Sequence, residues 1–507
     1  MKKVRVRFAP SPTGPLHIGG VRTALYNYLF AKKHGGDFIL RIEDTDQTRF
    51  VEGAQEYIEE ALEWSGLKVD EGIKQGGSFG PYKQSERRDI YKKYADILIE
   101  NGWGYYAFDT AEELDTLRKE AEANKSVFTY GPNTRAKLKN SINLSDDEVK
   151  KLIDEKTAYV IRFKTPENEE VVMQDIIRGE VKVNTSTLDD KVLFKSDGLP
   201  TYHLANVVDD HLMEISHVIR GEEWLPSLPL HFMLYKALGW ENEMPEFAHL
   251  PLILKPTGNG KLSKRDGDKM GFPVFPINWN VPNSDDIYKG YREDGYFPEA
   301  FSNMLAFLGW NPGDEREIMT MEELITDFSL ERVSKAGARF DPEKAKWFNH
   351  QWMQKLPIEK IVSEFKNILA EKSIIADDEV ITRIVEMVRE RSNFISELWN
   401  NSYFFFQAPT EYDAKTVKKK WKQDAPELMQ AIIDIFVELD DFTRDNTHDA
   451  VIAYIEKNEL GMGKVMNALR LCMVGAGAGP DLFTIIELIG KEESLKRIEN
   501  AILSINK

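Results

Sequence analysis

VRVRFAPSPTGPLHIGG, residues 4–20, is the stretch that decides the fold of this chain. Hydrophobic residues and arginines alternate over residues 4–8, which is typical of a short strand, and a glycine-rich turn follows. Apolar residues then recur at helical spacing over 21–29, and a second hydrophobic strand is expected over 38–42. Together these segments predict a parallel βαβ unit, in which ligands bind beyond the carboxyl ends of the strands.

Outward from this unit, the composition changes several times along the chain. Residues 101–200 combine charged helical patterns with β-rich segments, so we expect an insertion there. Sheet character is expected to resume at Thr201–Val208, His217–Arg220 and Phe247–Leu254. From residue 336 onward, amphipathic helical patterns predominate. These shifts predict an α/β protein with a helical C-terminal region.

Composition indicates a folded protein of several domains. The chain has 507 residues, too many for one ordinary core, and its 42% hydrophobic and 30% charged residues argue against disorder. It contains neither an apolar run long enough to span a membrane nor an apolar secretory signal. The single cysteine, Cys472, excludes an internal disulfide and suits a reducing compartment, so we expect a cytoplasmic location and no membrane.

A net charge of −18 restricts how the chain could bind nucleic acid. A uniformly acidic surface repels phosphate, so RNA binding would require separate basic patches. One candidate patch surrounds Trp421 and consists of Lys415, Lys418, Lys419, Lys420 and Lys422. From the sequence alone, a solvated helix face explains these lysines equally well.

Two motifs carry the chemistry. In residues 9–20, glycines permit close approach of a nucleotide and the following helix offers free N–H groups to phosphate. His17 in this motif could hydrogen-bond phosphoryl oxygens. In residues 258–267, GNGKLSKRDG, three cations on a glycine-flanked loop could stabilise a pyrophosphate leaving group. Alone, the first motif could be an ordinary turn and the second an exposed basic loop. Found together in this order and at this spacing, the two motifs form a highly specific signal of function.

The two motifs resemble the HIGH and KMSKS elements of class I aminoacyl-tRNA synthetases, since they read His17-Ile18-Gly19-Gly20 and Lys261-Leu262-Ser263-Lys264-Arg265. More narrowly, the chain is similar to bacterial glutamyl-tRNA synthetases over nearly its whole length. The further segments that carry this resemblance are 8–20, 41–46, 84–87, 201–224, 338–344 and 468–470.

The resemblance implies a fold with five parts. A Rossmann-like parallel-sheet catalytic domain is expected in two halves, residues 1–100 and 201–255, on either side of an inserted α+β acceptor-stem-binding domain over 101–200. A stem-contact domain with the KLSKR loop is expected over 256–335, and an all-α anticodon-binding region over 336–507.

The resemblance also implies an activity, namely ATP-dependent ligation of L-glutamate to tRNA(Glu) through glutamyl-adenylate, with release of pyrophosphate and AMP. The expected partners are L-glutamate, ATP with Mg²⁺, and tRNA(Glu), and we expect a monomer. Whether tRNA(Gln) is charged as well stays open. An inactive tRNA-binding scaffold is the alternative from another functional class, and the intact His17, Lys261 and Lys264 argue against it.

Site residues follow from the matched motifs. The amino-acid pocket would be lined by Arg7, Ala9, Ser11, Glu43, Tyr202, Asn206 and Arg220. ATP would contact Gly19, Glu223, the backbone of Leu254, and Lys264; the expected catalytic residues are His17, Lys261 and Lys264. Arg7 and Arg220 would offer one guanidinium for each carboxylate of glutamate, and Glu43 would suit its α-ammonium group.

Two segments depart from the family pattern. Many relatives carry zinc-binding cysteines after a Tyr-Tyr pair, whereas Tyr105-Tyr106 is here followed by Ala107-Phe108-Asp109, so we expect no zinc. Residues 268–285 are extra sequence after the lysine loop, and no role follows from their composition. The histidines over 203–217 do not share one helical face, so no metal site is expected there.

Overall fold

The computed structural model describes residues 3–505. The chain divides into two compact units, Met1–Phe348 and Asn349–Lys507. Within the described residues, no helix is long and apolar enough to cross a membrane. In the same range, no group of three or more His, Cys, Asp or Glu side chains is placed to hold a metal ion.

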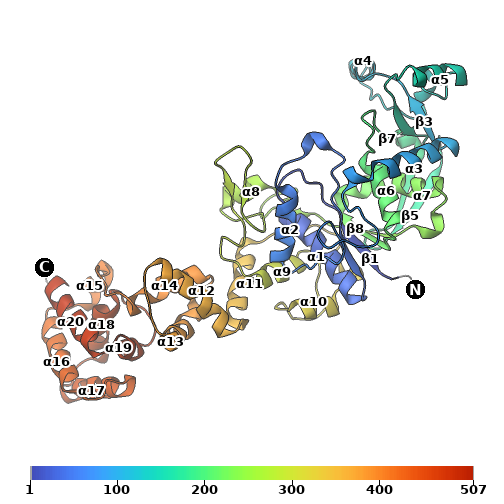
Figure 1. Ribbon diagram of the computed structural model, residues 1–507. Helices are drawn as coiled ribbons and strands as arrows, with labels where there is room; N and C mark the ends of the chain where they lie inside the picture. Colours follow the sequence, from blue (N-terminus) through green and yellow to red (C-terminus); the bar gives the residue numbers. More distant parts are fainter. Residues whose placement is uncertain (1–2, 506–507) are drawn as a thin grey trace. The chain divides into compact units, whose positions relative to one another are not determined.

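A six-stranded sheet forms the centre of the first unit, in the order β2-β1-β8-β9-β5-β6. Its strands are β1 (Arg5–Phe8), β2 (Asp37–Leu40), β5 (Glu170–Asp175), β6 (Gly179–Asn184), β8 (His217–Gly221) and β9 (Glu246–Leu250). Neighbouring strands from β2 to β5 are parallel, and β6 is antiparallel to β5. Helix α1 (Ile18–Lys33) connects β1 to β2, so the predicted βαβ unit is confirmed (Figure 1).

The prediction of a strand at Thr201–Val208 is wrong. These residues instead begin helix α6 (Tyr202–Leu212). Leu204, Val207 and Val208 are buried in the core that the helix shares with the sheet. A short apolar run does not distinguish a buried helix from a buried strand, which explains the error.

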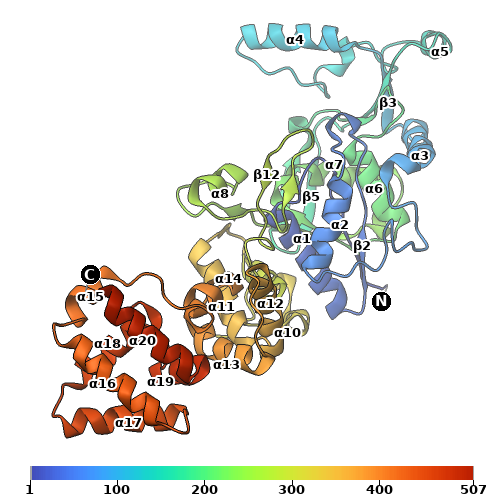
Figure 2. The ribbon, with the colours of Figure 1, turned by 60° about the vertical axis from the view of Figure 1, so that its left-hand side comes forward.

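Helix α2 (Ala54–Trp64) is followed by α3 (Arg88–Glu100). In the sequence between α3 and α6 the chain forms a smaller sheet. This sheet has the order β3-β4-β7 and comprises β3 (Gly104–Ala107), β4 (Val160–Phe163) and β7 (Val192–Phe194). Figure 2 shows α4 (Ala111–Ala123) and α5 (Asp146–Asp154) beyond β3. β5 and β6 fall inside the range 101–200 but belong to the six-stranded sheet. The sequence did not predict this, because the alternation of a hairpin does not reveal which sheet it will join.

The remaining strands of the first unit form two short pairs. β10 pairs in parallel with β13, and β11 pairs in antiparallel fashion with β12. One strand of this small hairpin thus lies in the extra segment 268–285 and the other just beyond it. The remaining elements are α7 (Leu228–Ala237), β10 (Ile253–Leu254), α8 (Lys264–Met270), β11 (Trp279–Asn280), β12 (Ile287–Tyr288), α9 (Pro298–Ala306), α10 (Met321–Asp327) and β13 (Ala338–Arg339). Helix α11 (Pro342–Lys355) begins in the first unit and ends in the second.

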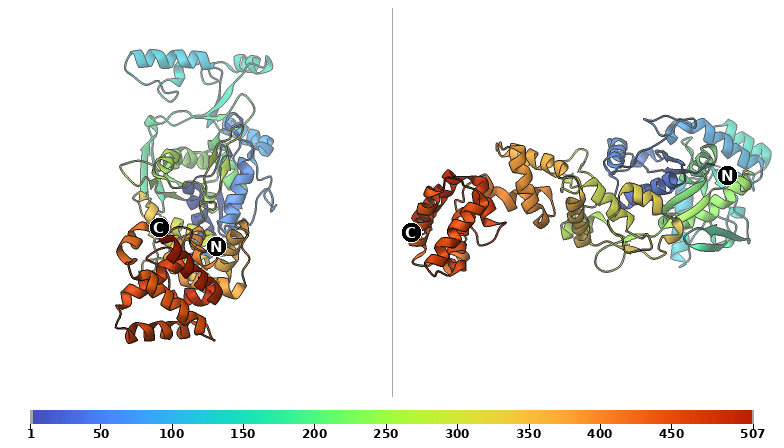
Figure 3. Two further views of the ribbon diagram at one scale, coloured as in Figure 1. Left: turned by 90° about the vertical axis from the view of Figure 1, so that its left-hand side faces the viewer. Right: turned by 90° about the horizontal axis from the view of Figure 1, so that it is seen from below.

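The second unit is helical, as its sequence pattern predicted (Figure 3). Its helices are α12 (Ile358–Glu371), α13 (Asp378–Val388), α14 (Ile395–Ser402), α15 (Ala414–Lys420), α16 (Ala425–Glu438), α17 (Arg444–Lys457), α18 (Met462–Val474), α19 (Leu482–Ile489) and α20 (Lys491–Ile505). Phe404 and Cys472 lie in its core, and burial raises the pKa of the Cys472 thiol. This cysteine is therefore a packing residue.

Candidate active site

A cavity of about 610 Å³ opens at the carboxyl ends of β1 and β8, where the strand order of the sheet reverses. Leu254 and Lys264 are not among its lining residues. The other predicted site residues all line it: Arg7, Ala9, Ser11, His17, Gly19, Glu43, Tyr202, Asn206, Arg220, Glu223 and Lys261. Residues of both sequence motifs thus face one cavity.

His17 caps the start of α1 and offers the cavity one hydrogen-bond donor. Its Nδ1 accepts a hydrogen bond from the backbone N–H of Gly19 at 3.2 Å. Its Nε2 is buried and has no partner among the described residues. Burial, assisted by the positive charge of Lys261, lowers the pKa of His17 to about 4. A neutral ring whose Nδ1 accepts carries its proton on Nε2, so His17 presents an unpartnered N–H.

Arg7 in β1 is held by a carboxylate. Its Nε and Nη2 donate to Oδ1 and Oδ2 of Asp210 at 3.0 and 3.3 Å. Arg41 contacts the same carboxylate at 2.8 Å, and all three residues are buried. Burial alone would raise the pKa of Asp210, but the two arginines hold it below its ordinary value. Asp210 therefore offsets part of the charge of Arg7.

Glu43 follows β2 and is a buried acceptor in the cavity wall. Its Oε1 accepts hydrogen bonds from Nη2 of Arg41 at 2.9 Å and from Nδ2 of Asn206 at 3.0 Å. Burial raises the pKa of Glu43 even though Arg41 opposes that shift. A cation placed against this carboxylate would favour its ionised form, so the position suits an ammonium group.

Arg220 in β8 has neutral hydrogen-bond partners. Its Nε donates to Nε2 of His249 at 3.0 Å, and its Nη1 donates to the Tyr202 hydroxyl at 2.7 Å. Its Nη2 makes a longer contact of 3.4 Å with the carbonyl oxygen of Trp224. No carboxylate within the described part of the chain pairs with Arg220, so its charge is available to an anion in the cavity.

Lys261 and Glu223 form an ion pair at the cavity wall. Nζ of Lys261 donates to Oε1 of Glu223 at 2.8 Å. Burial acts to raise the pKa of Glu223, but the hydrogen bond from Lys261 holds it below its usual value. Leu254 lies directly beside this pair, because it forms a backbone bridge with Lys261.

Lys264 begins α8 and contacts an aromatic ring. Its Nζ lies 2.9 Å from the centroid of the Tyr288 ring, a cation–π contact, and 4.0 Å from the carboxylate of Asp268. Tyr288 belongs to β12 and also lines a second, smaller cavity of about 270 Å³. In this structure the lysine therefore rests on the hairpin that follows its own loop.

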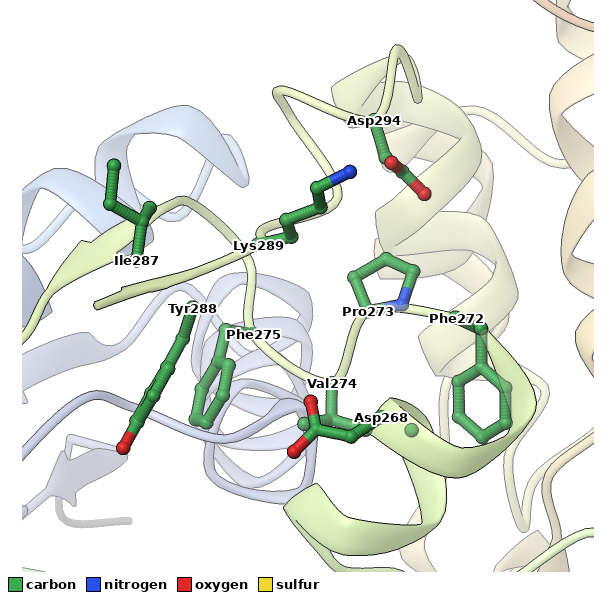
Figure 4. Close-up of a pocket in the computed structure, with 11 residues that line it drawn as sticks. Asp268, Phe272, Pro273, Val274, Phe275, Ile287, Tyr288, Lys289 and Asp294 are labelled. Carbon is green, nitrogen blue, oxygen red and sulfur yellow. The ribbon is translucent and has the colours of Figure 1, made fainter. Parts of the chain in front are cut away.

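Tyr288 and the extra segment together connect Lys264 to the first motif through a series of contacts. Tyr288 stacks on Phe275 with ring centroids 5.7 Å apart, and Figure 4 shows the two rings side by side. Phe275 meets the His17 ring edge-on at 6.1 Å. The carbonyl oxygen of Val274 accepts a hydrogen bond from the backbone N–H of Ile18 at 2.9 Å. The segment thus packs against the start of α1.

Several residues of the site had no signal in the sequence. Asp210 lies among the histidines over 203–217, for which no metal site was expected, and nothing in that pattern pointed to Arg7. His249 meets Arg220, and Asp175 meets His249, through the register of three strands, which a single sequence does not reveal. Phe275 lies in the segment 268–285, whose role could not be assigned, and Tyr288 lies just beyond that segment.

Comparisons with known families match consecutive parts of the chain. Residues 3–347 match the family described as "tRNA synthetases class I (E and Q), catalytic domain". Residues 351–502 match the family described as "Anticodon binding domain".

Individual relatives match the chain from end to end. It is 59% identical over 504 residues to the glutamate–tRNA ligase of Flavobacterium johnsoniae, covering 99% of this chain and 100% of that one. It is 58% identical over 500 residues to that of Christiangramia forsetii, covering 99% of each. A crystal structure of a glutamate tRNA ligase from Elizabethkingia meningosepticum in complex with its amino acid superimposes with a TM-score of 0.97 at 56% identity, covering 99% and 100%. This chain therefore belongs to the glutamate–tRNA ligase family of class I tRNA synthetases.

Proposed function

We propose that this chain ligates L-glutamate to tRNA(Glu) in two steps, through glutamyl-adenylate, and releases pyrophosphate and AMP. The names of its relatives support glutamate as the amino acid. One observation carries the proposal from the site itself. A single cavity is lined both by His17, with its unpartnered Nε2–H, and by Arg220, which pairs with no carboxylate in the described chain.

The amino acid is bound by charge matching. Glu43 receives the α-ammonium group, and Arg7 and Arg220 each receive one carboxylate. Nη1 of Arg7 donates to no group in the described residues, so this nitrogen is available although Asp210 occupies the other two. Ala9 and Ser11 complete the pocket wall, and Tyr202 and Asn206 orient the substrate by hydrogen bonds.

ATP binds with Mg²⁺ as a substrate complex beside the start of α1. His17 donates its Nε2–H to a phosphate oxygen, while Gly19, Glu223 and the backbone of Leu254 contact the nucleotide. The α-carboxylate of glutamate attacks the α-phosphorus in line, and the bond to pyrophosphate breaks. Lys261 and Lys264 stabilise the charge that develops on this leaving group.

A ribose hydroxyl at the end of the tRNA then attacks the acyl carbon of the adenylate, and AMP leaves. For this step we assign the acceptor stem to the insertion within 101–200, the stem contact to 256–335 and the anticodon to 336–507. The lysines at and after α15 are exposed, as a tRNA contact requires. We infer that the chain acts as a monomer.

The test is to charge total tRNA with labelled glutamate and to identify each acylated tRNA. Labelled tRNA(Glu) is expected, and it should depend on ATP with release of pyrophosphate. If tRNA(Gln) is labelled as well, the protein charges both tRNA(Glu) and tRNA(Gln) with glutamate. No labelled tRNA at all, from protein that binds ATP, would contradict the proposal and leave the scaffold alternative.

A further inference from the structure

Three neighbouring strands place a buried series of side chains behind the cavity. Arg220 in β8 and His249 in β9 are register partners in parallel strands, so their side chains lie on the same face of the sheet. Asp175 is the last residue of β5, the next strand in the sheet. All three side chains are buried.

Hydrogen bonds join the three residues in series. Oδ2 of Asp175 lies 2.6 Å from Nδ1 of His249, and Nε of Arg220 donates to Nε2 of His249 at 3.0 Å. Arg220 lines the active-site cavity, whereas Asp175 and His249 do not. The side-chain hydrogen bonds of Asp175 and His249 therefore reach the cavity through Arg220.

The orientation of the Asp175 carboxylate is fixed by the backbone. Its Oδ1 accepts hydrogen bonds from the backbone N–H groups of Ile177 and Arg178 at 3.0 and 2.8 Å. Oδ2 is consequently the oxygen that faces His249. Because a carboxylate oxygen only accepts, Nδ1 of His249 must carry the proton in this contact.

That contact determines what His249 offers to Arg220. Burial is the main cause that lowers the pKa of His249, although the hydrogen bond to Asp175 opposes it, so the ring is neutral at neutral pH. A neutral ring with a proton on Nδ1 has a lone pair on Nε2. This lone pair accepts the Nε–H of Arg220. Nη1 is then left beside Tyr202 and His231, and Nη2 beside the Trp224 carbonyl and the cavity.

We propose that Asp175 and His249 are positioning residues for amino-acid selection: Asp175 fixes the histidine tautomer, and His249 fixes the guanidinium of Arg220 toward a carboxylate of glutamate. The inference rests on the proposed function, because it takes Arg220 to bind that substrate. It adds two residues that touch neither amino acid nor ATP, so their substitution should change glutamate binding and leave ATP binding unaltered.

Asp175→Asn is the most specific test, because it keeps the shape of the side chain and reverses the direction of its hydrogen bond with His249. The backbone donors still require an oxygen at the Oδ1 position, so the new amide must direct its N–H₂ at Nδ1 of His249. The ring then carries its proton on Nε2, which faces the Nε–H of Arg220, and two donors oppose each other. We expect the KM for glutamate to rise about 10- to 100-fold, the scale of one lost hydrogen bond to a charged group.

Steady-state charging with labelled glutamate, with ATP and amino acid varied in turn, measures this effect. The KM for ATP should stay unchanged, and the ratio of kcat/KM for glutamate over glutamine should fall. A loss of packing alone would lower kcat/KM for both amino acids equally. Equal loss, or an unchanged KM for glutamate, overturns the inference.

His249→Gln tests the same series by rescue. Glutamine carries an acceptor and a donor side by side on one planar amide, so it can accept from Arg220 and donate to Asp175. It should retain most of the affinity for glutamate, whereas His249→Leu should lose it. This pair of variants also carries the test if Asp175→Asn does not fold; equal KM values for glutamate in both would overturn the inference.

Two further variants separate the possible failures. Asp190→Asn removes another buried carboxylate, which pairs with Arg135 and Tyr105, and should lower the thermal unfolding midpoint without changing the KM for glutamate. Arg220→Lys should raise that KM. If it does not, the role that the proposed function gives to Arg220 is wrong. If Arg220→Lys raises the KM and Asp175→Asn does not, the proposed function stands and the positioning inference is overturned.

Discussion

The carboxylate of Asp210 binds the guanidinium of Arg7 through two hydrogen bonds, Nε to Oδ1 at 3.0 Å and Nη2 to Oδ2 at 3.3 Å. Arg220, on the neighbouring strand, donates to a histidine and a tyrosine instead. The charge of Arg7 is therefore offset by a neighbouring carboxylate, whereas the charge of Arg220 is not offset by any carboxylate in the described residues. An anionic substrate group gains more from Arg220, which no carboxylate already neutralises.

Arg7→Gln should depress the use of glutamate far more than it changes ATP affinity. The substitution removes the Nη1 donor from the cavity, while Arg41 still pairs with Asp210 at 2.8 Å and keeps that carboxylate compensated. We expect kcat/KM for glutamate to fall about 10- to 100-fold, as for one lost charge-assisted hydrogen bond. Steady-state charging at varied glutamate and varied ATP measures both effects. Equal rises of the two KM values would contradict the assignment of Arg7.

Lys264→Ala should lower kcat for amino-acid activation by about 10²- to 10³-fold, the scale on which loss of one transition-state donor acts. Lys264 contacts Tyr288 and lies outside the cavity lining, so it has to leave this ring to reach pyrophosphate. Activation rates at saturating ATP and amino acid give the measurement. Lys269→Ala, an exposed lysine on the same helix, is the matched control and should have little effect. A change confined to the KM for ATP would show ground-state binding and refute the proposed role.

Replacing Lys418, Lys419 and Lys420 together by Glu should weaken tRNA binding. All three are exposed near the end of α15, and lost phosphate contacts reduce both the affinity and its dependence on salt. Binding measured over a salt series should show a shallower slope for the variant. The control replaces Lys372, Lys457 and Lys496 by Glu, which changes the net charge equally at exposed positions of the same unit. If both variants bind alike, these lysines form a solvated face.

His17 should remain neutral over the physiological pH range. Its pKa of about 4 lies below the value of 6.5 for an unperturbed histidine. Between these values the unfolded chain binds a proton that the folded chain does not, so stability rises with pH there. The contribution is complete above pH 6.5 and is lost as the pH falls toward 4. Histidine-ring NMR, assigned with His17→Asn, should show no titration of this ring above about pH 5.5; a midpoint near 6.5 would contradict it.

The sequence predicted the position of site residues where a motif directly follows the end of a strand. Glu43 could be placed at the cavity because a βαβ unit brings the ends of its strands to one edge, whereas the role of Arg7 followed from the resemblance of its motif. Contacts that depend on tertiary register could not be placed. Asp175 meets His249 only because the hairpin β5–β6 joins the large sheet, and nothing in its alternation selects that sheet over the smaller one.

Lys264 illustrates a second kind of limit. Its motif predicts a role at the nucleotide, yet in this structure the lysine lies on Tyr288, just beyond the extra segment. A lysine can have more than one stabilising partner. The motif identifies the group that Lys264 contacts in the reaction, but not the ring that it contacts in this structure. The helix at Tyr202–Leu212 was missed for a simpler reason, since a short apolar run has no decisive period.

Selection of glutamate by positive charge is tested most directly by kcat/KM of the unmodified protein for glutamate and for glutamine, measured in the presence of tRNA. Glutamine has nearly the same shape but would leave a guanidinium desolvated and unpaired, at a cost of about 2–5 kcal/mol. Glutamate should therefore be preferred by roughly 30-fold to several-thousand-fold. Equal efficiency with the two amino acids would contradict both the charge matching in the cavity and glutamate as the substrate.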